Sequence, residues 1–356
     1  MRLCSIAFLL LGLTLVSAAP EPTYKGKTLP EWLKALPSDD AAGRRDAASA
    51  LGQLGAGNPE AAEALVKALT DSDEQVRRLA VISLGELRPE AKLVVARLAD
   101  ILIKDRAASV RQQAAVLLGQ YGKEAKPALP ALVSRVRQQG ENPDVRQQSA
   151  RAIGRIGPEA REAIPALVAL LDDRDGSLLW FYAGEALVGI GADAVPAVVA
   201  VLRKPDGKLN SRAIDATTGF GRTAVPALRA ALKSPDAALR LAAAAALVRA
   251  SAEDAAPARP ILDVAVRATD YERRQAAMRA LSLLNFMTTP SVTGLVEALR
   301  HPQPDVRIDA ANCLGEHGPR GRDALPALRE ALKDRCSLGE VCQAMRDVFG
   351  DYRPSF

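Results

Sequence analysis

Apolar side chains recur with helical spacing, and one pattern of them returns every 30 to 35 residues. The segment DVRQQSARAIGRIG (144–157) has relatives in QVRRLAVISLGELR (75–88), SVRQQAAVLLGQYG (109–122) and DVRIDAANCLGEHG (305–318). In the first of these, Val145, Ile153 and Ile156 fall on one face of a helix that turns 100° per residue. Each copy therefore predicts an amphipathic helix.

We call the residue after the recurring valine the anchor position. The anchors of the ten copies are Arg44, Arg77, Arg111, Arg146, Trp180, Asn210, Arg240, Arg274, Arg307 and Cys342. A partner helix precedes most of them, as in EAREAIPALVALLDD (159–173), with a proline that kinks or opens it. Because a two-helix unit cannot bury its apolar faces alone, neighbouring units must stack. The sequence predicts an all-α fold, a right-handed α-solenoid of about ten repeats over residues 29–350, with a lead-in (19–28) and a tail (351–356).

A proline in the first helix, an acidic turn, and D-x-V-R followed by A-x-x-L-G in the second helix resemble HEAT repeats. The similarity is greatest to the short bacterial variety found in phycobilisome lyase-like proteins. YKGKTLPEWLKAL (24–36) also resembles the start of exported bacterial HEAT proteins. The resemblance implies a scaffold that binds a protein or peptide, because HEAT arrays mostly serve as binding surfaces. An accessory enzyme of the lyase-like kind is the alternative.

The resemblance also implies a structural role for the recurring arginine. In HEAT arrays this side chain pairs with acids and carbonyls of the turns and forms a ladder between units. The expected ladder residues are Arg44, Arg77, Arg111, Arg146, Arg240, Arg274 and Arg307. We expect Arg111→Ala to loosen the array and to lower its thermal stability.

The second helices of HEAT arrays line a concave surface, and residues one, five and nine positions after each anchor should face it. Phe181 and Leu241 both stand one position after an anchor. The candidate partner-binding residues are Phe181, Tyr182, Gln112, Gln147, Arg151, Arg155 and Glu185. A solvated polar face without a partner remains the alternative interpretation.

The fifth repeat departs from the pattern, because SLLWFYAG (177–184) places three aromatic residues together in a chain that is 4% aromatic. Trp180 takes the place of the anchor arginine, and we expect it to fill a gap between units. We expect Phe181 to contact a partner, since exposed aromatic side chains are typical of binding hot spots.

The charge pattern and the motifs argue against other functions. The chain has 47 basic and 42 acidic residues, and Glu86, Glu185 and Asp215 interrupt any basic strip, so we expect no nucleic-acid partner. A nucleic-acid-binding array is a further alternative that would need such a strip. The two histidines, His301 and His317, do not have the spacing of a zinc site. We therefore expect no catalytic, cofactor or metal site.

The N-terminus resembles a secretory signal peptide over residues 1–18, with cleavage after Ala18. Its 14 apolar residues are too few to span a bilayer, so we expect an exported protein, periplasmic or extracellular, whose mature chain has no membrane span. Three cysteines would remain, of which Cys336 and Cys342 are the better disulfide pair and Cys313 lies on an apolar helix face. Whether the pair is bridged stays open, as does the oligomeric state.

Overall fold

The structure is a computed structural model, which describes residues 21–172, 178–287, 292–317 and 323–331. The predicted signal peptide, Cys336, Cys342 and the C-terminal tail lie outside these residues. The described residues form helices joined by turns, and two isolated bridges, Tyr24–Lys27 and Arg203–Leu209, are their sole strand-like pairings. Within that part of the chain, no helix is both long and apolar enough to cross a membrane. The chain folds into two compact units, residues 1–89 and 90–356.

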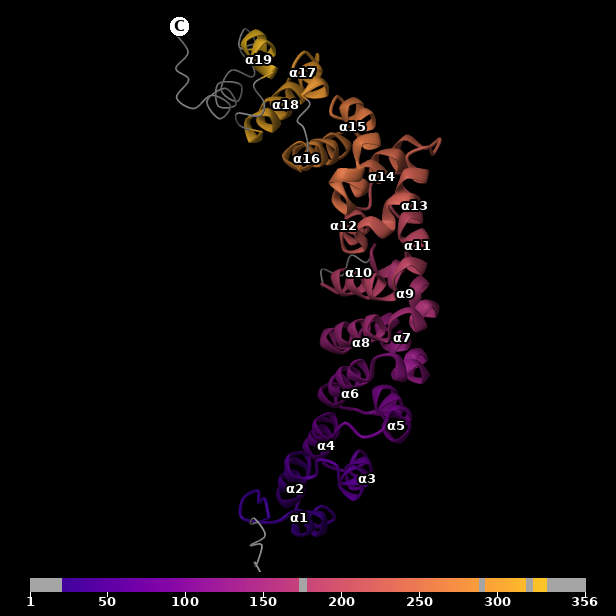
Figure 1. The fold of residues 1–356 in the computed structure, drawn as a ribbon, viewed down its shortest axis with the longest axis vertical. Helices are drawn as coiled ribbons and strands as arrows, with labels where there is room; N and C mark the ends of the chain where they lie inside the picture. The colour runs from indigo at the N-terminus through magenta and orange to yellow at the C-terminus, as the bar shows by residue number, and fades with distance from the viewer. Residues whose placement is uncertain (1–20, 173–177, 288–291, 318–322, 332–356) are drawn as a thin grey trace, which may run out of the picture. The chain divides into compact units, whose positions relative to one another are not determined.

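The first unit contains four helices. They are α1 (Leu29–Ala35), α2 (Ala41–Leu54), α3 (Pro59–Ala68) and α4 (Glu74–Leu87). Helix α2 packs against α4, α1 packs against α2, and α3 packs against α4 (Figure 1). Aspartates begin both longer helices: the Asp40 carboxylate accepts the N–H groups of Ala42 and Gly43, and the Asp73 carboxylate accepts that of Val76. Such caps satisfy backbone donors that lack a partner within the helix.

The second unit continues the same arrangement. Its α-helices are α5 (Ala91–Lys104), α6 (Ala108–Tyr121), α7 (Leu129–Arg137), α8 (Pro143–Ile156), α9 (Ile164–Leu170), α10 (Leu179–Ile190), α11 (Val195–Ala200), α12 (Ser211–Phe220), α13 (Val225–Ala231), α14 (Ala237–Ala250), α15 (Arg259–Ala265), α16 (Tyr271–Met287), α17 (Thr293–Ala298), α18 (Pro304–Glu316) and α19 (Leu325–Ala331). Its 3₁₀ helices are η1 (Gly122–Ala128), η2 (Gly157–Ala163), η3 (Ala192–Ala194), η4 (Gly221–Ala224), η5 (Ala252–Asp254) and η6 (Ala256–Ala258).

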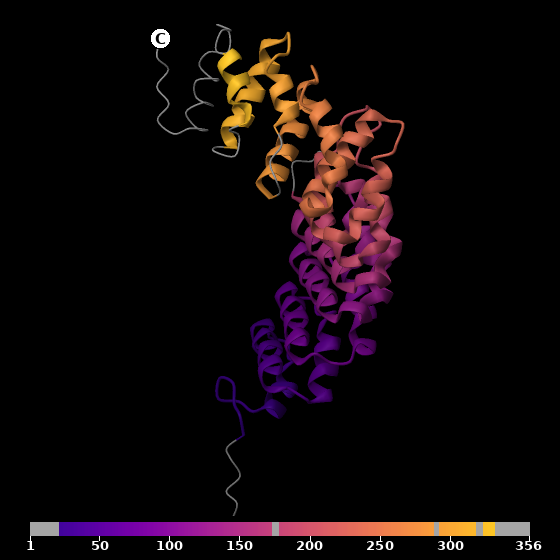
Figure 2. The same ribbon diagram turned by 45° about the horizontal axis from the view of Figure 1, so that its top comes forward.

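Two rows of helices lie side by side in the second unit (Figures 1 and 2). In the row of second helices, α6 packs against α8, α8 against α10, α10 against α12, and α12 against α14. In the row of first helices, α5 contacts α7, α7 contacts α9, α9 contacts α11, and α11 contacts α13. Each first helix also packs against the second helix of its own repeat. The core lies between the rows, where residues such as Leu132, Ile153 and Leu167 are fully buried.

Proline and glycine set the limits of the helices. A proline stands in the first turn of α7, α9, α11, α13 and α15, and a 3₁₀ segment precedes each of these helices. Proline is favoured there because its missing N–H would have no partner within the helix. Glycines with positive φ end α8 and α10, at Gly157 (φ +78°) and Gly191 (φ +94°).

The helices of the second row approach one another closely where small residues meet. A Cβ atom added to Gly154 of α8 would lie 2.8 Å from Cα of Ala186 in α10. A Cβ atom added to Gly189 of α10 would lie 2.5 Å from the carbonyl oxygen of Gly154. Gly154 stands at the glycine position of the repeat pattern, whereas Gly189 lies one residue after the equivalent position in its own repeat. The prediction of an all-helical α-solenoid of two-helix repeats is confirmed.

Candidate functional site

Three consecutive aromatic side chains begin helix α10, and they differ in exposure. Phe181 is 47% exposed, whereas Trp180 and Tyr182 are half-buried. The Phe181 ring meets Trp180 edge to face at a centroid distance of 6.1 Å and Tyr182 at 5.6 Å. Edge-to-face pairs at such distances are favourable. Phe181 is therefore held by its neighbours while half of it still faces solvent.

Arginines from the neighbouring second helices lie over the two flanking rings. The guanidinium carbon of Arg151 in α8 is 4.9 Å from the Tyr182 ring centroid, and that of Arg212 in α12 is 5.5 Å from the Trp180 centroid. These cation–π contacts connect α8, α10 and α12. Phe181 has no such cation partner among the described residues. Trp180 thus packs between repeats, at the place where most other repeats have an arginine.

A groove of about 590 Å³ runs between α10 and α12 beside Phe181. We call it the α10–α12 groove. Its lining is Trp180, Phe181, Gly184, Glu185, Val188, Gly189, Asp215, Ala216, Thr218 and Gly219. Most of these side chains are apolar or absent, and a Cβ atom added to Gly219 would lie 2.6 Å from Cγ2 of Val188. Two carboxylates mark the rim: Glu185 is exposed, and Asp215 is paired with Arg249 at 3.0 Å.

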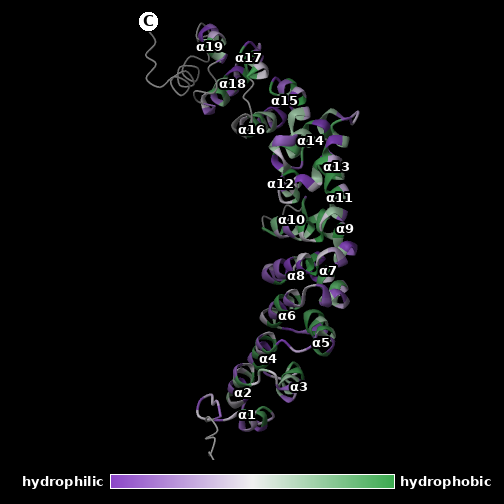
Figure 3. Cartoon of the chain, viewed as in Figure 1, coloured by the Kyte–Doolittle hydropathy of each residue, from purple (hydrophilic) through white to green (hydrophobic). Residues whose placement is uncertain are grey.

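The structure places the predicted binding residues on three adjacent helices. Gln112 lies on α6, and Gln147, Arg151 and Arg155 lie on α8; the two glutamines are half-buried and the two arginines are exposed. Of the predicted residues, Phe181 and Glu185 line the α10–α12 groove, and Tyr182 contacts Arg151 instead. Figure 3 shows the change of character along this row, since α8 is largely hydrophilic and α10 largely hydrophobic.

The helical-wheel interpretation is wrong at one position. Leu241 stands one residue after its anchor, like Phe181, but it is only 3% exposed. Helix α14 is rich in alanine, and it packs against α12, α13, α15 and α16, which leaves it little solvent-facing surface. Sequence reasoning also missed Val188 and Gly219, whose meeting depends on how α10 and α12 are aligned.

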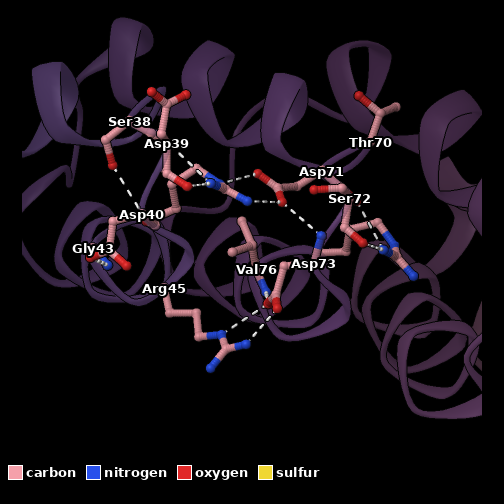
Figure 4. A network of polar contacts seen from close by, with 12 residues as sticks. Ser38, Asp39, Asp40, Gly43, Arg45, Thr70, Asp71, Ser72, Asp73 and Val76 are labelled. Carbon is pink, nitrogen blue, oxygen red and sulfur yellow. Dashed lines mark hydrogen bonds and ion pairs between the residues drawn. The ribbon is translucent and has the colours of Figure 1, made fainter.

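Most of the recurring arginines hold the turns of their own repeats, and Arg44, Arg111 and Arg274 also reach the next repeat. In the first unit, Nη1 of Arg44 donates to the carbonyls of Ser38 and Asp39 at 2.9 and 3.0 Å. Its Nε and Nη2 donate to the two carboxylate oxygens of Asp71 at 2.7 and 2.9 Å. Figure 4 shows this network, in which Arg45 also makes a two-pronged ion pair with Asp73, the residue that caps α4.

The carbonyl contacts recur along the second unit. In each case Nη1 donates to the carbonyls six and five residues earlier, as seen for Arg111 (Asp105 and Arg106), Arg240 (Ser234 and Pro235), Arg274 (Ala268 and Thr269) and Arg307 (His301 and Pro302). Arg77 of the first unit does the same with Asp71 and Ser72. Nε of Arg146 donates to the carbonyl of Val136, ten residues earlier, at 3.1 Å.

Within the described residues, Arg111 and Arg274 each pair with a carboxylate of the following repeat. Nη2 and Nε of Arg111 contact Glu141 at 2.5 and 3.1 Å, and Nε of Arg274 contacts Asp309 at 2.7 Å. Glu141 is nearly buried and also accepts from Arg135 at 2.9 Å. Burial alone would raise the pKa of Glu141, but hydrogen bonds from Arg111, the Asn142 N–H and Arg135 outweigh it and hold the pKa below its usual value.

The two histidines among the described residues do not lie together. His301 lies in the turn before α18 and His317 follows its last residue, so one helix separates the two histidines. The described residues contain no group of His, Cys, Asp and Glu side chains that could hold a metal ion. Cys313 is buried, and burial raises the pKa of its thiol to about 12. Such a thiol is inert.

Comparison with known proteins bears on most of the chain. A sequence model of HEAT repeats matches residues 29–96, 95–187, 195–282 and 258–338. A comparison with curated proteins finds no match. Among solved structures, Kap121p bound to Nup53p is similar with a TM-score of 0.60 at 10% identity, and Kap121p bound to Pho4p with 0.61 at 10%.

Each of these matches covers 90% of this chain and 41% of the Kap121p chain, so the chain spans about two fifths of that protein's length. At such low identity the likeness supports the fold alone. The repeat model, the paired helices and the Kap121p likeness agree with one another. The chain belongs to the HEAT-repeat family.

Proposed function

We propose that this chain is a non-enzymatic scaffold that binds a protein or peptide partner on the second-helix face formed by α8, α10 and α12. The observation that carries the proposal is the half-exposed Phe181 ring beside the α10–α12 groove. Clefts with apolar walls and a few polar groups at the rim are typical binding sites, and aromatic anchors commonly dominate their affinity.

The charges around the groove fit a polypeptide partner better than a phosphate backbone. Exposed Arg151 and Arg155 lie on α8, whereas Glu185 and Asp215 lie at the groove itself. A surface with both signs close together favours a partner that carries both, as polypeptides do. The two Kap121p structures similar in fold are both complexes with other proteins, which is consistent with such a role.

Affinity capture with matched variants tests the proposal. The tagged chain would be incubated with an extract of its native source, and captured proteins would be quantified by mass spectrometry for wild type, Phe181→Ala and Ile103→Ala. Ile103 serves as the control, because it is 39% exposed on α5, which is the first helix of its repeat and does not belong to the proposed surface. We expect Phe181→Ala to lose a partner that wild type and Ile103→Ala retain, with an unchanged circular dichroism spectrum. Identical partner lists for all three proteins would refute the proposed surface.

We also infer that the scaffold works outside the cytoplasm after removal of residues 1–18. The support is the sequence itself: Arg2, then an apolar stretch, then small residues before Ala18. N-terminal sequencing of the protein from a secreting host should find Ala19 first. A retained Met1 in the cytoplasmic fraction would contradict the inference.

A further inference from the structure

A second groove, of about 450 Å³, lies between α14 and α15 in a later repeat. We call it the α14–α15 groove. Its walls include Leu241, Ile261 and Val264, and three arginines, Arg240, Arg267 and Arg273, stand around them. Val264 is 63% exposed, although it is aliphatic. Apolar walls with several cations at the rim are an unusual combination for a surface without a ligand.

The corresponding groove of the first repeat shows what is different here. That groove lies against α3, the counterpart of α15, and its lining includes Arg44 of α2 (the counterpart of α14), Ala64, Lys67 and Asp71. Its arginine is satisfied on both edges, by two carbonyls and by the carboxylate of Asp71. Ion pairing at this position is therefore complete without a ligand.

Arg240 is equivalent to Arg44, but no carboxylate equivalent to that of Asp71 lies beside it. Its Nη1 donates to the carbonyls of Ser234 and Pro235 at 2.8 and 2.9 Å, and no ion pair to it is found among the described residues. Ala268 stands where Asp71 stands in the first unit. The equivalence is structural, since the Asp71 carbonyl accepts from Nη1 of the following anchor, Arg77, and the Ala268 carbonyl accepts from Nη1 of Arg274, both at 2.9 Å.

The wall residues differ in the same sense. Val264 lies ten residues before the anchor Arg274, and Lys67 lies ten residues before the anchor Arg77, so the two are equivalent. Ile261 and Ala64 are also equivalent, since each lies thirteen residues before the same anchors. An exposed lysine stem and a small alanine are thus replaced by two branched aliphatic side chains. Relative to the first repeat, the later groove has lost a carboxylate and has gained apolar wall.

The other two arginines differ in their pairing, and the Asp236 carboxylate, which pairs with Arg203 at 2.8 Å, lies near Arg273. Arg267 is paired with Glu297 at 2.6 Å, whereas the exposed Arg273 side chain makes no ion pair within the described residues. Arg240 and Arg273 therefore both have donors available to a ligand. A guanidinium recognises a carboxylate with two parallel hydrogen bonds, as Arg44 does with Asp71.

From this geometry we propose that the α14–α15 groove binds an acidic linear peptide of a partner protein. A carboxylate side chain of the peptide takes the position of the absent Asp71 equivalent and accepts from Arg240, with Arg273 beside it. A neighbouring aliphatic side chain of the peptide packs on Ile261 and Val264. This site does not include the α10–α12 groove, and the proposal does not depend on the function proposed for that groove.

The sequence of the first repeat supplies variants that should close the site without unfolding it. Ala268→Asp restores the ladder acid inside the protein, so that Arg240 is already paired. Val264→Lys restores the lysine and places a cation where the peptide's aliphatic side chain would lie. Both substitutions copy residues that the first unit accommodates at equivalent positions.

The test uses a phage-displayed library of random dodecapeptides selected on the full wild-type chain, with soluble Ala268→Asp protein as competitor. Enriched peptides would then be synthesised with capped ends, and their dissociation constants would be measured by fluorescence anisotropy. We expect a consensus of Asp or Glu next to Leu, Ile or Val. We expect binding to be weakened about tenfold or more by Ala268→Asp, since a hydrogen-bonded charge pair is lost, and also by Val264→Lys.

Three results would overturn the proposal: no enrichment, a consensus without an acidic residue, or equal affinity for wild type and Ala268→Asp. Peptides that lose affinity for Phe181→Ala but not for Ala268→Asp would place binding in the α10–α12 groove. That result would refute this site while supporting the proposed function. Thermal melting of Ala268→Asp at or above the wild-type temperature would show that lost binding does not reflect unfolding.

Discussion

Glu141 should be among the most sensitive positions of the array, because it is a nearly buried carboxylate between two arginines. Its side chain is 1% exposed, and those of Arg111 and Arg135 are 14% and 13% exposed. Replacing it by the isosteric Gln leaves both guanidinium groups poorly solvated and without a counter-charge. Removal of one partner from a buried ion pair costs about 3 kcal/mol or somewhat more. We therefore expect Glu141→Gln to lower the free energy of unfolding by about 3 kcal/mol at pH 7.

The pH dependence follows from the direction of the shift. The folded-state pKa of Glu141 lies below its usual value, so the stabilisation is present at pH 7 and is lost as the pH falls through the folded pKa. The difference between wild type and Glu141→Gln should therefore shrink below about pH 4.

Urea unfolding followed by circular dichroism at pH 7 and pH 3.5 measures both quantities. Hydrogen exchange of α6 and α8 localises the effect, since repeat arrays can open in part. Glu124→Gln is the matched control, because Glu124 is an exposed glutamate in the neighbouring η1 segment. A loss no larger than that of the control, or a loss unchanged at pH 3.5, would refute the reasoning.

Three further predictions concern packing and reactivity. Gly154→Ala should lower the free energy of unfolding by about 2 kcal/mol, since its Cβ would lie 2.8 Å from Cα of Ala186. Gly184→Ala should be neutral or stabilising, because the nearest neighbour of its Cβ would lie at 3.4 Å. Urea titrations of the two variants measure the difference between them. Phe181→Ala should cost only about 1 kcal/mol in thermal melts, because half of the ring is exposed, and a loss of core size would assign Phe181 to the core. Cys313 should resist iodoacetamide at pH 8 in the native protein, because burial raises its pKa to about 12; peptide mapping that finds it modified as fast as in urea would contradict this.

The repeat period was sufficient to predict the helices and their pairing. Apolar spacing defines the buried face of each helix, and a unit of two amphipathic helices has to stack on its neighbours. The exposure of Phe181 also follows from its position one residue after the anchor. Leu241 shows the limit of that rule, because burial at the same position depends on how many helices surround it, and α14 is surrounded by four.

Features that depend on the alignment of adjacent repeats could not be predicted. In the α10–α12 groove, Val188 lies against Gly219 across two helices, and their sequence separation carries no such information. The partner of each ladder arginine is similarly variable: Asp71 precedes the next anchor, whereas Asp309 follows it. That Ala268 replaces an acidic partner of Arg240 follows only from comparing its turn with the turn that contains Asp71 in the structure.

The central claim is that partners bind the second-helix face at Phe181. The most direct measurement is photo-crosslinking with p-benzoylphenylalanine in place of Phe181 or, as a control, in place of Glu162, which is exposed on η2 before a first helix. We expect a specific crosslinked partner from position 181, displaced by excess unlabelled wild-type protein, and none from position 162. Equal crosslinking from both positions, or none from position 181, would contradict the account.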